Sequence, residues 1–307
     1  MTKQDFLQAP DSPELDVAEL TKLAGFAKHL GKANLVPSHR IQNGSHRTHL
    51  RGHGMEMLEV RQYHSSDELR HIDWRVSART GKTHTRVYTE EKEHSRLLVL
   101  SLSSNAYFGT TATFISTRIV QLMALIAWRT KQHNDKIGAC LQFGPQMHFL
   151  PSKNTTNQLQ ALLTYLSQAT HIKNRHHSSN DSVWSLLQKH TIKQQNMVIC
   201  SDQSSLSTTE LVQLRQLAKH NTVHWITIQD KRLAQLPTGM YQFEDPTGVY
   251  TIHASQSTIK NSQEKKRQVN RQLMQQLNNM GIHYHLFDLT ESPIQIARHL
   301  LFRGVIS

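Results

Sequence analysis

The sequence is poor in cysteine, in glycine and in long apolar runs, and each shortage excludes a class of protein. Two cysteines among 307 residues are too few for the disulfide network of a small secreted domain, so Cys140 and Cys200 are expected to be buried, reduced thiols. Thirteen glycines form neither a Gly-x-Gly-x-x-Gly nor a Walker-type Gly-x-x-x-x-Gly-Lys-Ser/Thr loop, and Gly-x-Ser-x-Gly and His-Glu-x-x-His are also missing. We therefore expect no catalytic residues and no enzymatic activity.

The N-terminus lacks the apolar segment of a signal peptide. The most apolar run, residues 119–128, would rise only about 15 Å as a helix, which is half of a bilayer core. The sequence therefore predicts a buried helix, no membrane span, and a cytoplasmic protein whose contact with any membrane complex would be peripheral.

Charge is distributed unevenly along the chain. Residues 1–94 contain 14 Lys and Arg against 13 Asp and Glu, whereas residues 95–307 contain 21 against 10. Such a basic excess attracts acidic protein surfaces, anionic lipid or nucleic acid. The predicted helix at residues 258–280 is the most basic element. Its cationic residues are Lys260, Lys265, Lys266, Arg267 and Arg271.

A nucleic-acid-associated protein is accordingly the second hypothesis. Binding that falls steeply with salt would support it. The sequence argues against it, because only 7% of residues are aromatic and neither a helix-turn-helix nor a zinc spacing is present. We interpret the basic helix as a solvated face or as one that meets an acidic partner.

Strands and helices alternate regularly from residue 96 onward. Apolar strands are predicted at residues 97–102, 137–143, 197–201, 222–228 and 282–287. Helices are predicted at 114–133, 155–168, 180–190, 208–220, 258–280 and 293–303, with hairpins at 137–150 and 238–254. This alternation predicts an α/β fold, a doubly wound and mostly parallel sheet covered by helices on both faces.

Residues before 96 form a predicted smaller subdomain. Ser12-Pro13-Glu14 signals the start of a helix over 13–30, and short β-strands follow. The predicted domains are a helix-plus-β subdomain at 1–95, the α/β domain at 96–290 and a C-terminal docking helix at 291–307.

Polar residues follow the first and fourth strands of the predicted sheet. Because ligands of doubly wound folds bind at the carboxyl ends of the strands, Ser101, Ser103, Asn105 and Asp202 are the candidate site. This order resembles the metal-ion-dependent adhesion site of von Willebrand factor A domains, in which the first strand ends in Asp-x-Ser-x-Ser and a later strand ends in Asp. Ser103 and Asp202 match, whereas Ser101 replaces the leading Asp and Asn105 the last Ser.

The resemblance implies a von Willebrand factor A-like fold with a degenerate metal site. The middle Thr of the pattern has no clear match in this sequence. Candidates in the relevant loop are Ser178, Ser179 and Asp181. Mg²⁺ requires carboxylate charge and several oxygen ligands, so no cofactor is expected to be required. Weak Mg²⁺ binding, with Asp202 as the main charge and Ser103 as a hydroxyl ligand, is the most that the pattern allows. A hydrolase at the same edge would need a base near Ser101 or Ser103, which the sequence does not locate.

A second motif lies upstream, between residues 59 and 79. It reads Arg-x-Tyr, Asp-x-x-Arg, Ile-Asp-Trp and Ala-Arg, on Arg61, Tyr63, Asp67, Arg70, Asp73, Trp74 and Arg79. The motif resembles the bacterial family called domain of unknown function fifty-eight, over roughly residues 50–290, with Ser66 in place of the usual Gly. Members of that family are linked to MoxR-type AAA+ ATPases. The resemblance implies a soluble adaptor that works with such an ATPase and an unknown client protein.

This motif has two interpretations that stay open. Arg–carboxylate pairs and a Trp that needs a hydrogen-bond partner would make a structural clasp that holds the subdomain against the main sheet, or the cluster is a partner-docking surface. The histidines at 46, 49 and 53, and His283 with His285, lack neighbouring Cys or acidic ligands. We interpret them as surface residues.

Overall fold

The computed structural model describes residues 12–31, 55–65, 67–90, 94–176, 182–235, 237–245 and 248–306. The chain divides into two compact units, one made of residues 1–36 with 94–307 and the other of residues 37–93. Each unit is considered by itself. The predicted loop residues Ser178, Ser179 and Asp181, the histidines at 46, 49 and 53, and Ser66 lie outside the described residues.

The larger unit is built on a six-stranded sheet in the order β10-β7-β6-β3-β4-β5. Its strands are β3 (Ser95–Ser101), β4 (Lys136–Phe143), β5 (Gln146–Lys153), β6 (Asn196–Ser201), β7 (Thr222–Gln229) and β10 (His283–Asp288). All neighbours pair in parallel except β4 with β5. The chain begins this sheet at β3, adds β4 and β5 on one side, and then adds β6, β7 and β10 on the other. This is the strand order of a doubly wound fold, and its direction of growth reverses between β3 and β6. The predicted α/β class with a mostly parallel sheet is confirmed.

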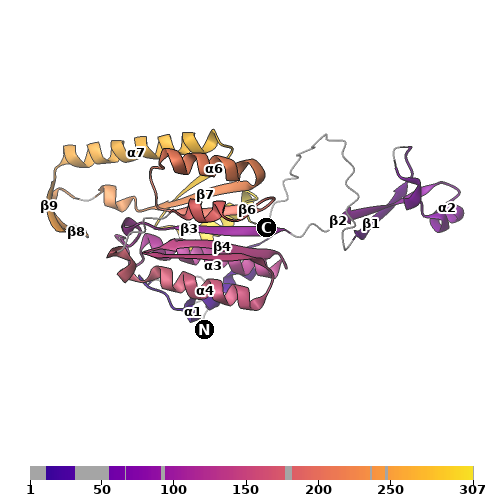
Figure 1. Cartoon of the computed structure of the whole chain (residues 1–307), viewed down its shortest axis with the longest axis horizontal. Coiled ribbons are helices and arrows are strands. Elements are labelled where there is room, and N and C mark those ends of the chain that lie inside the picture. Colours follow the sequence, from indigo (N-terminus) through magenta and orange to yellow (C-terminus); the bar gives the residue numbers. More distant parts are fainter. Residues whose placement is uncertain are drawn as a thin grey trace. The chain divides into compact units, whose positions relative to one another are not determined.

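Helices cover both faces of this sheet (Figure 1). One layer contains α1 (Val17–Lys28), α3 (Ile115–Gln132), α4 (Thr156–Thr170) and α8 (Pro293–Phe302), and the other contains α5 (Val183–Gln188), α6 (Thr208–His220) and α7 (Gln256–Asn278). A small antiparallel hairpin of β8 (Gly239–Asp245) and β9 (Gly248–Ala254) precedes α7. Among the described residues, no helix is long and apolar enough to cross a membrane.

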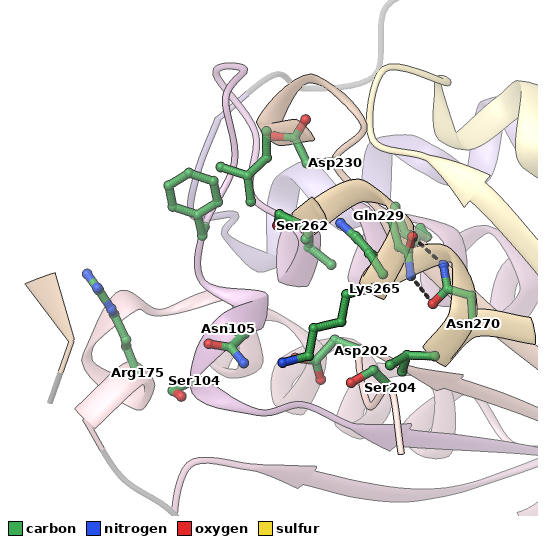
Figure 2. A pocket seen from close by; sticks show the side chains of 16 residues that line it. Ser104, Asn105, Arg175, Asp202, Ser204, Gln229, Asp230, Ser262, Lys265 and Asn270 are labelled. Carbon is green, nitrogen blue, oxygen red and sulfur yellow. Dashed lines mark hydrogen bonds between the residues drawn. The ribbon is translucent and has the colours of Figure 1, made fainter. Parts of the chain in front are cut away.

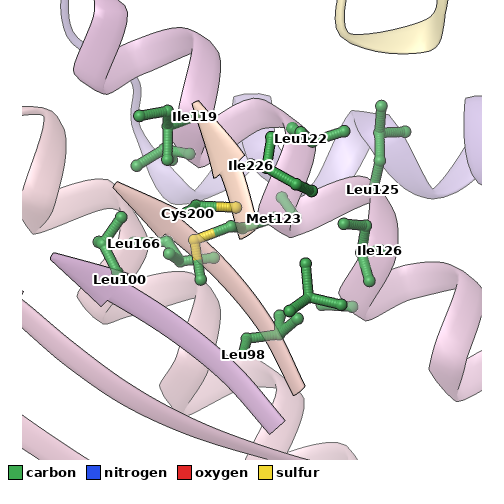
Figure 3. Close-up of a cluster of buried hydrophobic side chains, with 14 of the residues drawn as sticks. Leu98, Leu100, Ile119, Leu122, Met123, Leu125, Ile126, Leu166, Cys200 and Ile226 are labelled. Atoms are coloured by element: carbon green, nitrogen blue, oxygen red, sulfur yellow. The ribbon is translucent and has the colours of Figure 1, made fainter. Parts of the chain in front are cut away.

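The apolar strands are explained by burial on both faces. In β3, Leu98 and Leu100 join the core beneath α3, whereas Leu97 and Val99 join the opposite core with Trp225. Figure 3 shows the first of these cores, where Met123 of α3 packs against the strands. Both cysteines are buried and free, as predicted. Alternate side chains of a strand point to opposite faces, so a strand covered on both sides must be apolar throughout.

The first helix belongs to the larger unit, which differs from the predicted domain of residues 1–95. Asp16 caps α1, and the apolar face of this helix contacts α3 and α4. The Trp128 indole N–H donates to the carbonyl of Leu20 at 3.0 Å, and the amide of Leu15 donates to Thr170 at 3.0 Å. A helix adjacent to the subdomain in sequence is thus tied to the sheet domain by buried contacts.

The smaller unit, as far as it is described, consists of an antiparallel pair, β1 (Met55–Gln62) with β2 (His84–Glu90), and short helical segments between them. These are η1 (Leu69–His71) and α2 (Trp74–Thr80). The Asp73 carboxylate accepts from the backbone amides of Arg75 and Val76, which caps α2 at its start. Gly81 ends the helix in a left-handed conformation, with φ 72°. The sequence pattern did not predict α2, because a polar seven-residue helix has no apolar periodicity.

Candidate functional site

The carboxyl ends of β3 and β6 meet at the point where the strand order reverses. A crevice forms at such a switch point because the crossovers from the two strands lead to opposite faces of the sheet. The segment after β3 continues into η2 (Ser104–Ala106), and Asp202 follows β6 directly. The sequence-predicted residues are therefore brought to one edge, as their positions at strand ends required.

Ser103 and Asp202 form the closest contact of this edge. The Ser103 hydroxyl donates to one carboxylate oxygen of Asp202 at 2.5 Å, and the Ser103 amide donates to the other at 2.8 Å. Burial raises the pKa of Asp202, while these two hydrogen bonds act in the opposite direction. Both oxygens of the carboxylate are thus bound by the loop after β3, which joins the two strand ends.

Ser101 and Asn105 have different surroundings from that pair. Ser101 is the last residue of β3 and is buried, with 3% of its surface exposed. Asn105 lies in η2 with an exposed side chain. Of the four predicted residues, Asn105 and Asp202 line a cleft, whereas Ser101 and Ser103 do not.

This cleft has a volume of about 540 Å³. Its polar lining comes from Ser104, Asn105, Arg175, Asp202, Ser204, Gln229, Asp230, Ser262, Lys265, Lys266 and Asn270, and apolar side chains such as Phe108 and Val269 complete it. Arg175 belongs to η3 (Ile172–His176), and Lys265, Lys266 and Asn270 belong to α7. Gln229 and Asn270 exchange two hydrogen bonds at 2.8 and 3.0 Å, which tie α7 to the end of β7.

Figure 2 shows the Lys265 side chain extending toward Asp202 and Asn105. Lys265 is exposed, and within the described residues it makes no hydrogen bond or ion pair. Lys266 is half-buried: burial lowers its pKa, and the nearby carboxylates of Asp230 and Asp288 oppose that shift. The two adjacent lysines therefore differ, since Lys266 is partly buried near two acids of the protein, whereas Lys265 is exposed at the cleft.

The second acid of the lining, Asp230, is bound by hydrogen-bond donors of the protein itself. Its carboxylate accepts from the amide and hydroxyl of Thr110, at 2.6 and 3.0 Å, and from the amide of Arg232 at 3.0 Å. Only 1% of its surface is exposed. Like Asp202, its carboxylate is bound by donors of the protein, and Asp230 therefore presents little negative surface to the cleft.

The family-type motif lies in the smaller unit, where its charged residues form local ion pairs. Arg61 pairs with Asp67 at 2.7 Å, and Arg86 pairs with Asp73 at 2.8 Å. Arg70 pairs with Glu68, Tyr63 donates its amide to Thr83, and Arg79 lies in the last turn of α2. Trp74, whose indole N–H was expected to need a hydrogen-bond partner if the motif is a clasp, is 70% exposed. Each of these ion pairs joins two residues of the smaller unit, whereas the side chains of Trp74 and Leu69 are exposed.

Of the two histidines of β10, His283 is exposed as expected, whereas His285 is only partly exposed and approaches a buried histidine of β7. His285 lies 3.4 Å from His224 of β7, measured between ring nitrogens, and His283 stacks on the same ring. Burial lowers the pKa of His224 to about 3 and that of His285 to about 4, and the neighbouring histidines add to both shifts. Within the part of the chain that the structure describes, no three His, Cys, Asp or Glu side chains are arranged to hold a metal ion.

Sequence reasoning found the strand-end residues of this site and missed those contributed by α7. The basic helix was recognised, yet nothing in its pattern distinguishes Lys265 from Lys260. The distinction arises only where α7 crosses the carboxyl edge, which depends on the packing of Leu273 and Leu277 in the second core.

The fold and this edge define an α/β protein with a polar cleft at the switch point of a doubly wound sheet. Residues 59–273 match the family described as "Protein of unknown function DUF58". Since the match covers most of the chain, the protein belongs to this family, and the sequence-based recognition is confirmed.

The curated relatives it matches are themselves uncharacterized. Rv1480 of Mycobacterium tuberculosis and Mb1516 of Mycobacterium bovis are each 28% identical to this chain over 123 residues. That match covers 40% of this chain and 39% of each relative, so it spans less than half of their length.

Two solved structures resemble the chain in part. A conserved hypothetical protein, BatB from Bacteroides thetaiotaomicron, is 10% identical and has a TM-score of 0.36; the match covers 61% of this chain and 98% of that one. An uncharacterized membrane spanning protein from Vibrio fischeri is 16% identical with a TM-score of 0.18, over 68% and 96% of the two chains. At these scores neither structure defines the fold of this chain.

Proposed function

We propose that this protein is a non-enzymatic adaptor that binds a partner protein at the carboxyl edge of its sheet. The cleft at the switch point carries the proposal, because it is the concave polar surface that the fold itself creates between β3 and β6. The bound partner would contact Asn105 and Ser104 of the loop after β3 and the residues around Asp202.

The chemistry of the cleft favours binding over hydrolysis. Acyl transfer by serine needs a base within hydrogen-bond reach of the hydroxyl. Ser103 does not line the cleft and its hydroxyl is already bound to Asp202, and the described lining contains neither histidine nor cysteine. A nucleophile with its base is thus not among the lining groups.

A von Willebrand factor A-like fold is part of the same proposal. The strand order and the positions of Ser103 and Asp202 support it. In that reading the metal site is degenerate. The described residues fit Mg²⁺ poorly, since Asp202 is the one carboxylate among the four predicted positions, and both of its oxygens already accept hydrogen bonds from Ser103.

The partner proposed is a MoxR-type AAA+ ATPase, acting with this chain on a client protein. Family resemblance supports this choice, and the cleft supplies a place for the contact. The basic excess of residues 95–307 supports the second candidate, a nucleic-acid-associated protein that would use the same half of the chain.

Affinity capture separates these two functions. The tagged chain would be recovered from its native cells after nuclease treatment, with and without added ATP and Mg²⁺, and its partners identified by mass spectrometry. Nucleotide-dependent recovery of an AAA+ ATPase is the expected result. Recovery of no ATPase, together with loss of every partner after nuclease treatment, would overturn the proposal in favour of nucleic acid.

A further inference from the structure

The carboxyl edge of β3 and β6 places Ser103 and Asp202 as in a cation site, but it lacks the further ligands that a cation needs. A divalent cation there would need carboxylate charge to replace its tightly held water. Ser101 stands where a second carboxylate would be required, and the oxygens of Asp202 are bound by Ser103. The donor set therefore fits a divalent cation poorly.

A cation of the protein itself is directed to this position. The ammonium group of Lys265 extends toward Asp202 and Asn105 (Figure 2) and lines the cleft beside them. α7 is tied to the sheet by the Gln229–Asn270 hydrogen bonds, which lie about one helical turn further along from Lys265. The backbone that carries Lys265 is therefore fixed next to the strand ends.

A ligand in the cleft would meet positive charge and neutral donors. The two acids of the lining accept hydrogen bonds within the protein, Asp202 from Ser103 and Asp230 from Thr110 and the amide of Arg232. Lys265 contributes an ammonium group, and the exposed Asn105 and Ser204 contribute amide and hydroxyl donors. An ammonium with neutral donors beside it is suited to a carboxylate.

We propose that Lys265 takes the place of the metal ion at this edge and binds a side-chain carboxylate from an acidic segment of the partner protein. This inference rests on the proposed adaptor function and names the chemistry of its partner. No divalent cation takes part in the contact.

The cleft favours an acidic peptide over a phosphate ligand. A phosphate group carries up to two negative charges, and the carboxylates of Asp202 and Asp230, although bound by protein donors, lie in the same lining. A single carboxylate needs less compensating charge. The volume of about 540 Å³ accommodates a few peptide residues, and its openness to solvent allows the chain to continue beyond it.

The test uses a fluorescein-labelled hexaglutamate peptide with the full chain, at low salt and in the presence of EDTA. Lys265→Gln should weaken binding about ten-fold, since a charge-assisted hydrogen bond is lost. Lys260→Gln is the matched control, because it removes the same charge from the same helix outside the cleft lining. Lys265→Arg should restore most of the affinity, and carbodiimide coupling should join the peptide to Lys265.

Four results would overturn the inference. Equal weakening by Lys260→Gln and Lys265→Gln would mean that bulk charge binds the peptide. Binding that EDTA abolishes would mean that a metal ion is needed. Tighter binding of a short single-stranded DNA, lost with Lys265→Gln, would assign the cleft to nucleic acid. If the peptide fails to bind while nucleotide-dependent capture of the ATPase persists, this inference is wrong and the adaptor function stands. If the peptide binds through Lys265 but no ATPase is captured, only the ATPase partner is rejected.

Discussion

The two units use charged residues in different ways. In the smaller unit Arg61 pairs with Asp67 and Arg86 pairs with Asp73, and among the side chains described there, those of residues 59–65 and 67–86, Ile72 is the one apolar side chain that is nine-tenths buried. In the α/β unit two apolar cores hold the layers together, and the charges gather at the edges of the sheet. The motif that marks the family thus forms local structure in one unit, while the cleft lies in the other.

This contrast separates the motif residues, which identify the family, from the cleft residues, which are proposed to bind the partner. Asp73 caps α2 and pairs with Arg86, so its place in the motif has a structural explanation. Asn105 and Lys265 lie outside the motif and have an exposed position in the cleft. We infer that motif residues and binding residues are largely different sets in this protein.

Truncation of a core residue should have the largest effect on stability. Leu98 is fully buried in β3, so Leu98→Ala should lower the free energy of unfolding by about 2–5 kcal/mol, through lost apolar contacts and the cavity left behind. Leu69→Ala in the smaller unit, at a side chain that is 68% exposed, should change it by less than about 0.5 kcal/mol. Urea titration measures both. Similar losses would contradict the contrast between the units.

Acid should weaken the two units in different pH ranges. The pKa of His224 is lowered to about 3 and that of His285 to about 4. The unfolded chain therefore takes up protons first, and the larger unit should lose stability as the pH falls from about 6.5 toward 4, on the order of 3 kcal/mol. Protonation of Asp202, whose pKa burial raises, has the opposite sign and reduces this loss.

In the smaller unit, hydrogen bonds from Arg86 lower the pKa of Asp73, and bonds from His64 and Arg61 lower that of Asp67. Their contribution is present above the unfolded value, near 4, and is lost only below it. His285→Gln should flatten the pH dependence of the larger unit, because it removes one of the two buried histidines whose pKa is lowered. Hydrogen exchange from pH 7 to 4 resolves the units, and simultaneous loss of protection in both would rule out this assignment.

Removal of the helix cap should act within the smaller unit alone. Asp73→Ala deletes the acceptor for the amides of Arg75 and Val76 and the partner of Arg86. Amide protection in α2 should fall several-fold, with no change in β3 or β6. Trp74→Ala, at the exposed next position, should leave protection unchanged. Hydrogen exchange read by mass spectrometry provides the comparison, and an equal effect of both variants would argue for a packed Trp74.

The smallest expected effect is a regained metal affinity. Ser101→Asp with Asn105→Ser adds a carboxylate and a hydroxyl beside Asp202, so calorimetry should detect Mg²⁺ binding in the millimolar range or somewhat tighter. Adding Lys265→Gln should strengthen it further, because a competing ammonium is removed. Absence of binding in both variants would mean that the loop after β3 has lost the geometry for coordination.

Most of the larger unit could be predicted from sequence, because its strands are apolar on both faces and its helices are amphipathic. Residues 208–220 were predicted as a helix and form α6, and the hairpin of β4 and β5 follows the Gly144-Pro145 turn. Two features of the fold were not predicted from the sequence. α2 is defined by its caps rather than by periodicity, and α1 packs on α3 through contacts that sequence order does not reveal.

The candidate site was predictable only in part, for a related reason. Ser103 and Asp202 lie at strand ends, and strand ends of a parallel sheet share an edge. Lys265 reaches that edge from a helix more than sixty residues further along the chain than Asp202. Its position depends on how α7 packs, which no local pattern specifies.

The most direct test of the proposed contact compares one exposed residue from each unit. Asn105→Arg would fill the cleft edge, Trp74→Ala would remove an aromatic side chain of the smaller unit that is 70% exposed, and Gln272→Arg on α7 controls for added charge outside the cleft. Each tagged variant would be used to capture partners from native cells with ATP and Mg²⁺. We predict that Asn105→Arg loses the AAA+ ATPase while the other two retain it. Retention by Asn105→Arg together with loss by Trp74→Ala would contradict the account and place the contact in the smaller unit.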